Sequence, residues 1–108
     1  MAQANIKCLD TIRLFVEEIK KYFIVEGVYL FGSQAKVEAK KDSDIDLIII
    51  SNHFEKMDPL DRLVLLGKIA WKAKTPEIEA IGYTSEEFFQ AKPWDFAAEI
   101  RRSGISVF

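Results

Sequence analysis

The chain has 108 residues, 49% of them hydrophobic, and its 15 basic and 17 acidic residues give a formal net charge of −2. This length predicts a single domain over residues 1–108, and the charge balance does not suggest a surface that coats nucleic acid, although a local basic patch stays open. The lone cysteine, Cys8, excludes an internal disulfide, and no apolar run reaches the roughly 18 residues of a membrane span. Because the N-terminus has no apolar signal core, we expect a cytoplasmic protein.

Hydrophobic periodicity in the first half of the chain predicts one helix followed by two buried strands. Apolar residues at three- and four-residue steps predict a helix over residues 4–23. The sequence VYLFGS, residues 28–33, predicts a short buried strand that ends in a Gly-Ser turn. A helical turn over residues 33–37 and a polar loop then lead to a second strand over residues 44–51.

A second helix is predicted after this strand. Asp58 is typical of an N-cap and Pro59 of a first helical position, and Pro76 lies beyond the end of the helix. We expect the apolar residues of this helix to form a stripe along it, and the aromatic side chains here and downstream to belong to the core. The expected stripe residues are Leu60, Leu63, Val64, Gly67, Ala70 and Trp71, and the expected core aromatics are Trp71, Phe88, Phe89, Trp94 and Phe96.

The remaining chain predicts one more strand and two short helices. Residues 77–83 indicate a third strand, and Thr84 with Glu87 three residues later indicates a capping box for a helix. A last helix over residues 94–102 is expected to stop at Gly104, with a short edge strand at the C-terminal end. Helices that alternate with buried strands favour an α/β (α+β) fold with a small mixed sheet flanked by helices.

Two aspartates interrupt the second strand at its start. Asp44 and Asp46 are two residues apart, so their side chains share a face of the strand, with Cα atoms roughly 6.5 to 7 Å apart. Two carboxylates that close repel each other and resist burial unless a cation compensates them. Carboxylate oxygens suit Mg²⁺ or Mn²⁺, and Mg²⁺ is usually held by one or two carboxylates together with substrate phosphates.

The Gly32-Ser33 turn lies about a dozen residues before this pair. It follows a strand and precedes a predicted helical turn, where free N–H groups favour phosphate. Gly32 permits close backbone approach to an anion, and Ser33 adds a hydroxyl donor. A Gly-Ser pair alone is usually a turn, and two spaced aspartates alone are usually a solvated strand edge. Together, in this order and spacing, they favour metal-assisted phosphoryl or nucleotidyl transfer.

The combined motif, LFGSQA followed by SDIDLIII, resembles the nucleotidyltransferase superfamily of the DNA polymerase β type, and most closely the minimal nucleotidyltransferases. The resemblance implies a small mixed sheet covered by helices. It also implies transfer of a nucleoside monophosphate from a nucleoside triphosphate to a hydroxyl, with loss of pyrophosphate. Asp44 and Asp46 match the metal-binding pair of the family, and Gly32 and Ser33 match the turn that holds the β- and γ-phosphates.

A third carboxylate, which the family usually carries on a neighbouring strand, is expected at Glu79. An acidic residue inside the apolar strand over residues 77–83 is unusual unless its face meets that of the aspartates. Glu77 shares the face by alternation and stays an alternative, as does a solvated edge glutamate with no catalytic task. Three converging carboxylates would hold two Mg²⁺ ions, and Glu79 would act as base or as ligand.

The chain departs from the family at Gln34, where a basic residue is common. Gln34 still offers hydrogen bonds to a phosphate or ribose, and Lys36, Lys40 and Lys41 lie nearby. This departure leaves room for weak or lost activity.

The resemblance implies two functions that share a partner. The first is an Mg²⁺-dependent nucleotidyltransferase, with ATP as the expected donor and a protein or RNA hydroxyl as acceptor. The second is an antitoxin-like module that neutralises a HEPN-domain ribonuclease, with or without attaching AMP to it. Since a domain of this size has little room for acceptor recognition, we expect a partner protein or a homo-oligomer to supply it.

Overall fold

A four-stranded sheet runs through the protein, which we describe from a computed structural model over residues 6–32 and 44–108. The strand order is β3-β2-β1-β4, and the order in space therefore differs from the order in sequence. β1 is antiparallel to both β2 and β4, whereas β2 and β3 are parallel, so the sheet is mixed as predicted. The strands are β1 (Gly27–Phe31), β2 (Ile45–Ile50), β3 (Ile78–Tyr83) and β4 (Ile105–Ser106).

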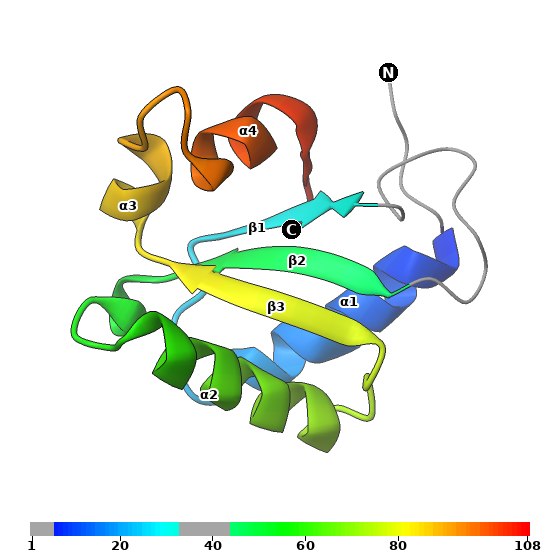
Figure 1. The fold of residues 1–108 in the computed structure, drawn as a ribbon. Helices are drawn as coiled ribbons and strands as arrows, with labels where there is room; N and C mark the ends of the chain where they lie inside the picture. Colours follow the sequence, from blue (N-terminus) through cyan, green and yellow to red (C-terminus); the bar gives the residue numbers. More distant parts are fainter. Residues whose placement is uncertain (1–5, 33–43) are drawn as a thin grey trace.

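Helices cover both faces of this sheet, which confirms the predicted class (Figure 1). The two long helices, α1 (Ile6–Ile19) and α2 (Pro59–Lys72), lie on one face. The two short helices, α3 (Ser85–Phe89) and α4 (Phe96–Ser103), lie on the other. A 3₁₀ turn, η2 (Asn52–Phe54), follows β2. None of the described helices is long and apolar enough to cross a bilayer.

The main core fills the space between the sheet and the two long helices. Successive strand residues point to opposite faces, so alternate residues of β1, β2 and β3 turn towards α1 and α2. Cys8 belongs to this core, and burial raises the pKa of its thiol to about 11, so the thiol stays protonated at neutral pH. The buried strand residues of this face are Val28, Leu30, Ile45, Leu47, Ile49, Ile78 and Ala80.

The opposite face of the sheet is covered over part of its length. Ile48 and Ile50 of β2 pack there against Phe88 and Ile100, which belong to α3 and α4. Because α3 and α4 are short, they reach only the C-terminal part of β2 and β3 (Figure 1). The N-terminal ends of these two strands are left without a covering helix from the described part of the chain.

Arg62 ties α2 to the start of α3. Its guanidinium is buried and donates to the carboxylate of Glu87, to the carbonyl of Gly82 and to the carbonyl of Met57. Glu87 also completes the predicted capping box with Thr84, in which both reciprocal hydrogen bonds are present. These contacts fix the guanidinium of Arg62 beside the carboxylate of Glu87. The hydrogen bond from Arg62 lowers the pKa of the Glu87 carboxyl.

Four of the predicted core aromatics were wrong, and all residues of the predicted stripe of α2 except Ala70 are exposed. α2 turns Arg62, Leu66, Ile69 and Ala70 inwards, and Leu65 is partly buried against the main core. Leu60, Leu63, Val64 and Trp71 face solvent. Trp71 is 78% exposed and Trp94 is 80% exposed, while of the five aromatics only Phe88 is buried. The error arose because two apolar stripes run along α2, and periodicity alone does not say which of them meets the sheet. The exposed residues are Leu60, Leu63, Val64, Trp71, Phe89, Trp94 and Phe96.

Candidate functional site

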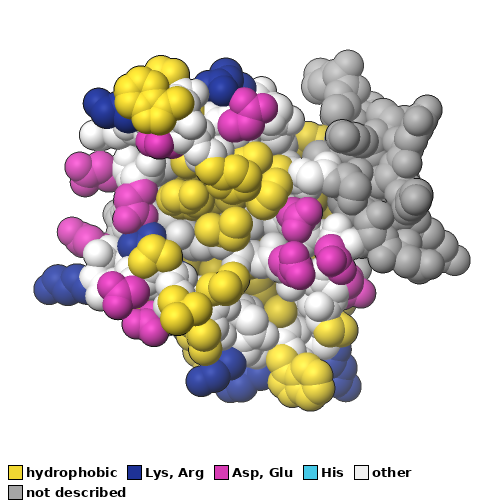
Figure 2. All heavy atoms as spheres, viewed as in Figure 1, with side chains coloured by type: hydrophobic (Ala, Val, Ile, Leu, Met, Phe, Trp, Pro, Cys, Tyr) yellow, Lys and Arg dark blue, Asp and Glu magenta, His cyan; other side chains and the backbone are white. Residues whose placement is uncertain are grey.

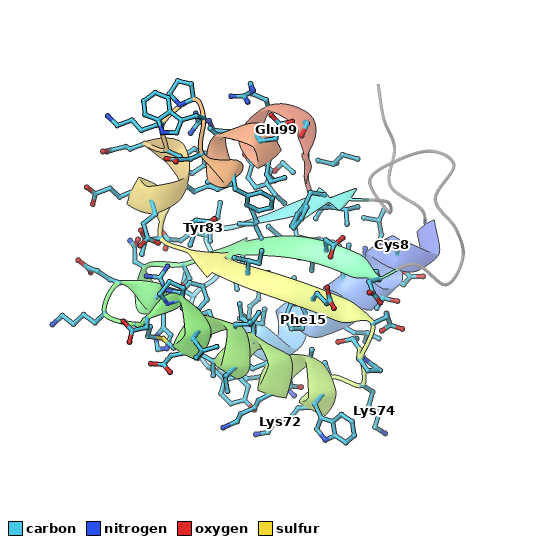
Figure 3. The ribbon with its side chains drawn as sticks, viewed as in Figure 1. Cys8, Phe15, Lys72, Lys74, Tyr83 and Glu99 are labelled. Carbon is cyan, nitrogen blue, oxygen red and sulfur yellow. The ribbon has the colours of Figure 1, made fainter. Side chains whose placement is uncertain are left out.

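Asp46 and Glu79 lie side by side on the uncovered end of the sheet. β2 and β3 are parallel, and their register pairs Asp46 with Glu79 as direct neighbours. Neighbouring strands lie about 4.8 Å apart, and residues paired in register point to the same face. The flanking residues Ile45, Leu47, Ile78 and Ala80 all enter the main core, so both carboxylates point to the face away from α1 and α2. β2 and β3 can be followed side by side in Figure 3.

Asp44 lies directly before β2 and adds a third negative charge to this region. The start of β2 is fixed to β3, because the N–H of Ile45 donates to the carbonyl of Glu77 over 2.9 Å. Partial burial raises the pKa of Asp46, and the negative charges of Glu79 and Asp44 raise it further. Since repulsion between carboxylates contributes to this shift, the charges of Asp44, Asp46 and Glu79 act on one another. We call these three residues the acidic site.

Gly32 brings the backbone against the carboxylate of Asp46. Its φ of +74° lies in the left-handed region, which favours glycine. It follows Phe31, the residue that pairs with Asp46 across β1 and β2. A Cβ added at Gly32 would run into the carboxylate oxygen of Asp46. Two independent constraints therefore require glycine here, and one of them is contact with the acidic site. The neighbouring predictions, Ser33 and Gln34, lie outside the described residues.

No basic side chain within residues 6–32 and 44–108 forms an ion pair with the acidic site. The ion pairs of this part of the chain involve Glu18, Glu87 and Glu99 instead. The same ranges contain no ready-formed group of three metal-ligating side chains. The carboxylates are therefore gathered without being tied to one another or to a cation. Lys36, Lys40 and Lys41 lie outside the described residues.

Comparison with known proteins identifies the family. The sequence model of the family described as "Nucleotidyltransferase domain" matches residues 9–105, a range that includes Gly32 and the whole acidic site. The chain belongs to the nucleotidyltransferase domain family. This confirms the resemblance to the polymerase β-like superfamily and supports the assignment of the protein as a transferase.

A solved structure shows that the nucleotidyltransferase fold is also shared. The crystal structure of a candidate nucleotidyltransferase from Sulfolobus solfataricus superposes with a TM-score of 0.65 at 22% sequence identity. The alignment covers 94% of this chain and 79% of that protein. At this identity the likeness is evidence for the fold alone. No relative was found among curated proteins.

An apolar surface borders the acidic site of this nucleotidyltransferase. Phe31 pairs with Asp46 across the sheet, and its ring packs edge-on against Phe96 of α4, with ring centroids 5.4 Å apart. Ile81 follows Glu79 by two residues on the same face of β3 and is partly exposed. Figure 2 shows acidic side chains next to a hydrophobic area over the part of the sheet below α4.

Sequence reasoning missed this apolar surface. The signal for Ile81 was present, because strand alternation places it on the face of Glu79. Phe96 was assigned to the core, although it is exposed over about half of its surface. Its position beside Phe31 depends on how α4 folds back over β1, which periodicity does not show.

Proposed function

We propose that the protein transfers a nucleoside monophosphate from a nucleoside triphosphate, with ATP as the donor, to a hydroxyl of a protein or RNA. The observation that carries this proposal is the register pair of Asp46 and Glu79, with Gly32 against the Asp46 carboxylate. It places a glycine turn, which suits a phosphate chain, beside gathered carboxylates on a rigid sheet. We also propose that residues 1–108 form the single domain that does this.

We infer that the acidic site would bind a divalent cation. Asp46 is partly buried beside two other carboxylates, and no cation of the described residues pairs with them. A bound Mg²⁺ would relieve this repulsion, and oxygen ligands of this kind suit Mg²⁺ or Mn²⁺. Asp44, Asp46 and Glu79 are the residues that would hold one or two such ions. When bound, the ions would neutralise the triphosphate and lower the pKa of the acceptor hydroxyl.

Glu79 is a proposed acceptor of the proton that the hydroxyl loses. In the proposed reaction the acceptor oxygen bonds to the α-phosphorus, and the bond from that phosphorus to the bridging oxygen of the β-phosphate breaks. Pyrophosphate leaves, and the hydroxyl proton passes to the Glu79 carboxylate or to water. Glu79 is exposed, so both the acceptor and solvent reach it. Glu79 serves in this proposal as base or as metal ligand.

The neighbouring residues suggest where the rest of the donor lies. Gly32, with Ser33 and Gln34, would receive the β- and γ-phosphates. The apolar surface of Phe31, Ile81 and Phe96 would receive the nucleoside, because a base offers an apolar face to aromatic and aliphatic side chains.

A labelling experiment tests the proposal directly. The protein is incubated with Mg²⁺, ATP labelled at the α-phosphate, and protein or RNA acceptors, and transfer of label is measured. We expect Asp46→Asn and Glu79→Gln each to reduce transfer by at least about 100-fold. Each substitution removes a negative charge that the proposed reaction requires for metal binding or proton transfer. Glu77→Gln is the matched control, because Glu77 precedes β3 and should leave transfer unchanged. Equal losses in Glu77→Gln and Glu79→Gln would contradict the assignment of Glu79.

The partner of the enzyme stays a prediction. A HEPN-domain protein is the expected acceptor or target, and the antitoxin-like alternative requires only binding to it. Co-expression with such a ribonuclease separates the two functions: if Asp46→Asn still neutralises the ribonuclease, occlusion is sufficient. If neutralisation is lost while binding is retained, transfer of the nucleotide is required. A cytoplasmic location likewise stays a prediction.

A further inference from the structure

α2 carries a second apolar stripe on its outer side, made of Leu60, Leu63, Val64, Gly67 and Trp71. We call these five residues the outer stripe. Apart from the adjacent Leu63 and Val64, they follow one another at steps of three or four residues, which places them along one side of a helix. Arg62, Leu66 and Ile69 occupy the inner side against the sheet.

The outer stripe is far more exposed than apolar residues of an amphipathic helix usually are. Leu60 is 68% exposed, and Leu63 and Val64 are each exposed over about half of their surface. Hydrophobic side chains are visible along the surface over α2 in Figure 2. A contiguous exposed apolar stripe of this kind is typical of a binding surface.

Gly67 lies near the middle of the outer stripe, and neither its backbone conformation nor its surroundings within the chain require a glycine. A Cβ added there would meet no atom within 4 Å, and its φ is not in the left-handed region. Glycine inside a helix lowers helix stability relative to alanine, so its presence on an open surface needs another explanation. A glycine lets another backbone approach closely, and a second helix packed across α2 would use that space.

The outer stripe of one copy is complementary to the outer stripe of a second copy when the two α2 helices run antiparallel. Leu60 and Trp71 lie equally far from the middle of the helix, as do Val64 and Gly67. In an antiparallel pair of α2 helices, the small Gly67 of one copy therefore faces Val64 of the other, and Trp71 faces Leu60. A pocket of about 470 Å³ beside Trp71, lined also by Lys74 and Pro76, offers space for the opposing leucine.

The charges that flank the outer stripe match the same arrangement. At 100° per residue, Asp61, Lys68 and Lys72 fall along one flank, with the acid near the N-terminus and the lysines near the C-terminus. A two-fold axis brings equal flanks of two antiparallel helices to the same side, so Asp61 comes opposite the interval between Lys68 and Lys72 of the other copy. Lys72 and Lys74 are labelled at the end of α2 in Figure 3.

We propose that two copies of the chain associate through their α2 helices, antiparallel and about a two-fold axis. The occupant is a second copy because the apolar pattern, the glycine and the charges are each self-complementary in one register. α2 lies on the sheet face opposite to the acidic site, so pairing leaves both acidic sites open. The proposal does not depend on the proposed enzymatic function.

Mass measurement against concentration tests the pairing. Size-exclusion chromatography with light scattering, and sedimentation velocity, should give a mass near 25 kDa, about twice the 12.4 kDa of one chain. Trp71→Glu should raise the dissociation constant by roughly 30-fold or more, the effect expected when a charge replaces a tryptophan that the interface buries. Trp94→Glu is the matched control, because Trp94 is as exposed as Trp71 but lies outside α2. A wild-type chain that stays at 12.4 kDa up to high micromolar concentration overturns the proposal.

A charge exchange tests the register. Asp61→Lys alone and Lys68→Asp alone should each weaken association, since each places like charges opposite one another. The double variant should restore it. Because both residues are exposed, far-ultraviolet circular dichroism should show folded protein throughout. If the double variant is no better than the single variants, the antiparallel register is wrong.

Discussion

Replacing Asp46 with asparagine should abolish transfer and at the same time stabilise the fold. Asp46 is paired in register with Glu79, so their carboxylates lie on neighbouring strands at a separation of roughly 6 Å. Two like charges at this distance repel by about 0.7 kcal/mol in a water-like dielectric and by about 3 kcal/mol at an effective dielectric of 20. Glu79 is exposed and Asp46 is only partly buried, so we expect the lower part of this range, about 0.5 to 1 kcal/mol.

The pH dependence fixes the sign of this effect. The folded-state pKa of Asp46 is raised, so the folded protein holds this proton more tightly than the unfolded chain does. Stability is therefore lost as the pH rises above the ordinary aspartate pKa, which is 3.8, through the raised value. Asp46→Asn removes this loss, so it should be more stable than the wild type at pH 7, with no such difference at pH 3.

Thermal unfolding followed by circular dichroism measures the difference. For a chain of 108 residues, 1 kcal/mol corresponds to a shift in Tm of about 4 °C, so Asp46→Asn should unfold about 2 to 4 °C higher at pH 7. Mg²⁺ should raise the Tm of the wild type more than that of the variant, because an ion that binds only the folded state stabilises it. An Asp46→Asn protein that is less stable at pH 7, or a gain that persists at pH 3, would refute the reasoning.

Three further substitutions probe the elements around the site. Gly32→Ala should lower stability by roughly 1 to 2 kcal/mol, because alanine is strained at a positive φ, and denaturant titration measures this loss. It should also reduce metal binding, measured by calorimetry, because the added methyl group runs into the Asp46 carboxylate. Glu87→Gln should lower stability by about 0.5 to 1 kcal/mol at pH 7, because Arg62 lowers the pKa of Glu87 but the Glu87 side chain is 44% exposed and solvent screens the pair. The loss should fade as the pH drops below 4.5, and unfolding curves at several pH values follow this. Gly67→Ala should stabilise the monomer by about 0.5 to 1 kcal/mol, since the methyl group meets nothing; a loss of stability in dilute protein would contradict this.

The local signals in the sequence predicted the elements well. The Asp58-Pro59 start, the Thr84-Glu87 capping box and the strand around Glu79 all appear in the structure, because caps and alternation depend on residues a few positions apart. The first helix ends at Ile19, four residues earlier than expected, and a turn follows in which two N–H groups share the Ile19 carbonyl. Helix ends depend on tertiary packing and are harder to place from sequence.

The tertiary structure decided three further features. The sequence predicted that Asp46, two residues after Asp44, lies on a strand whose opposite face is buried, but only the parallel pairing of β2 with β3 places Glu79 beside Asp46. The sequence determined that α2 carries apolar residues at helical spacing, but only packing decided that Leu66 and Ile69 meet the sheet while Trp71 faces solvent. The sequence placed a glycine at position 32, but only the fold set its backbone against the Asp46 carboxylate. In each case the deciding contact joins strands or layers that are distant in sequence, and short-range periodicity carries no information about such contacts.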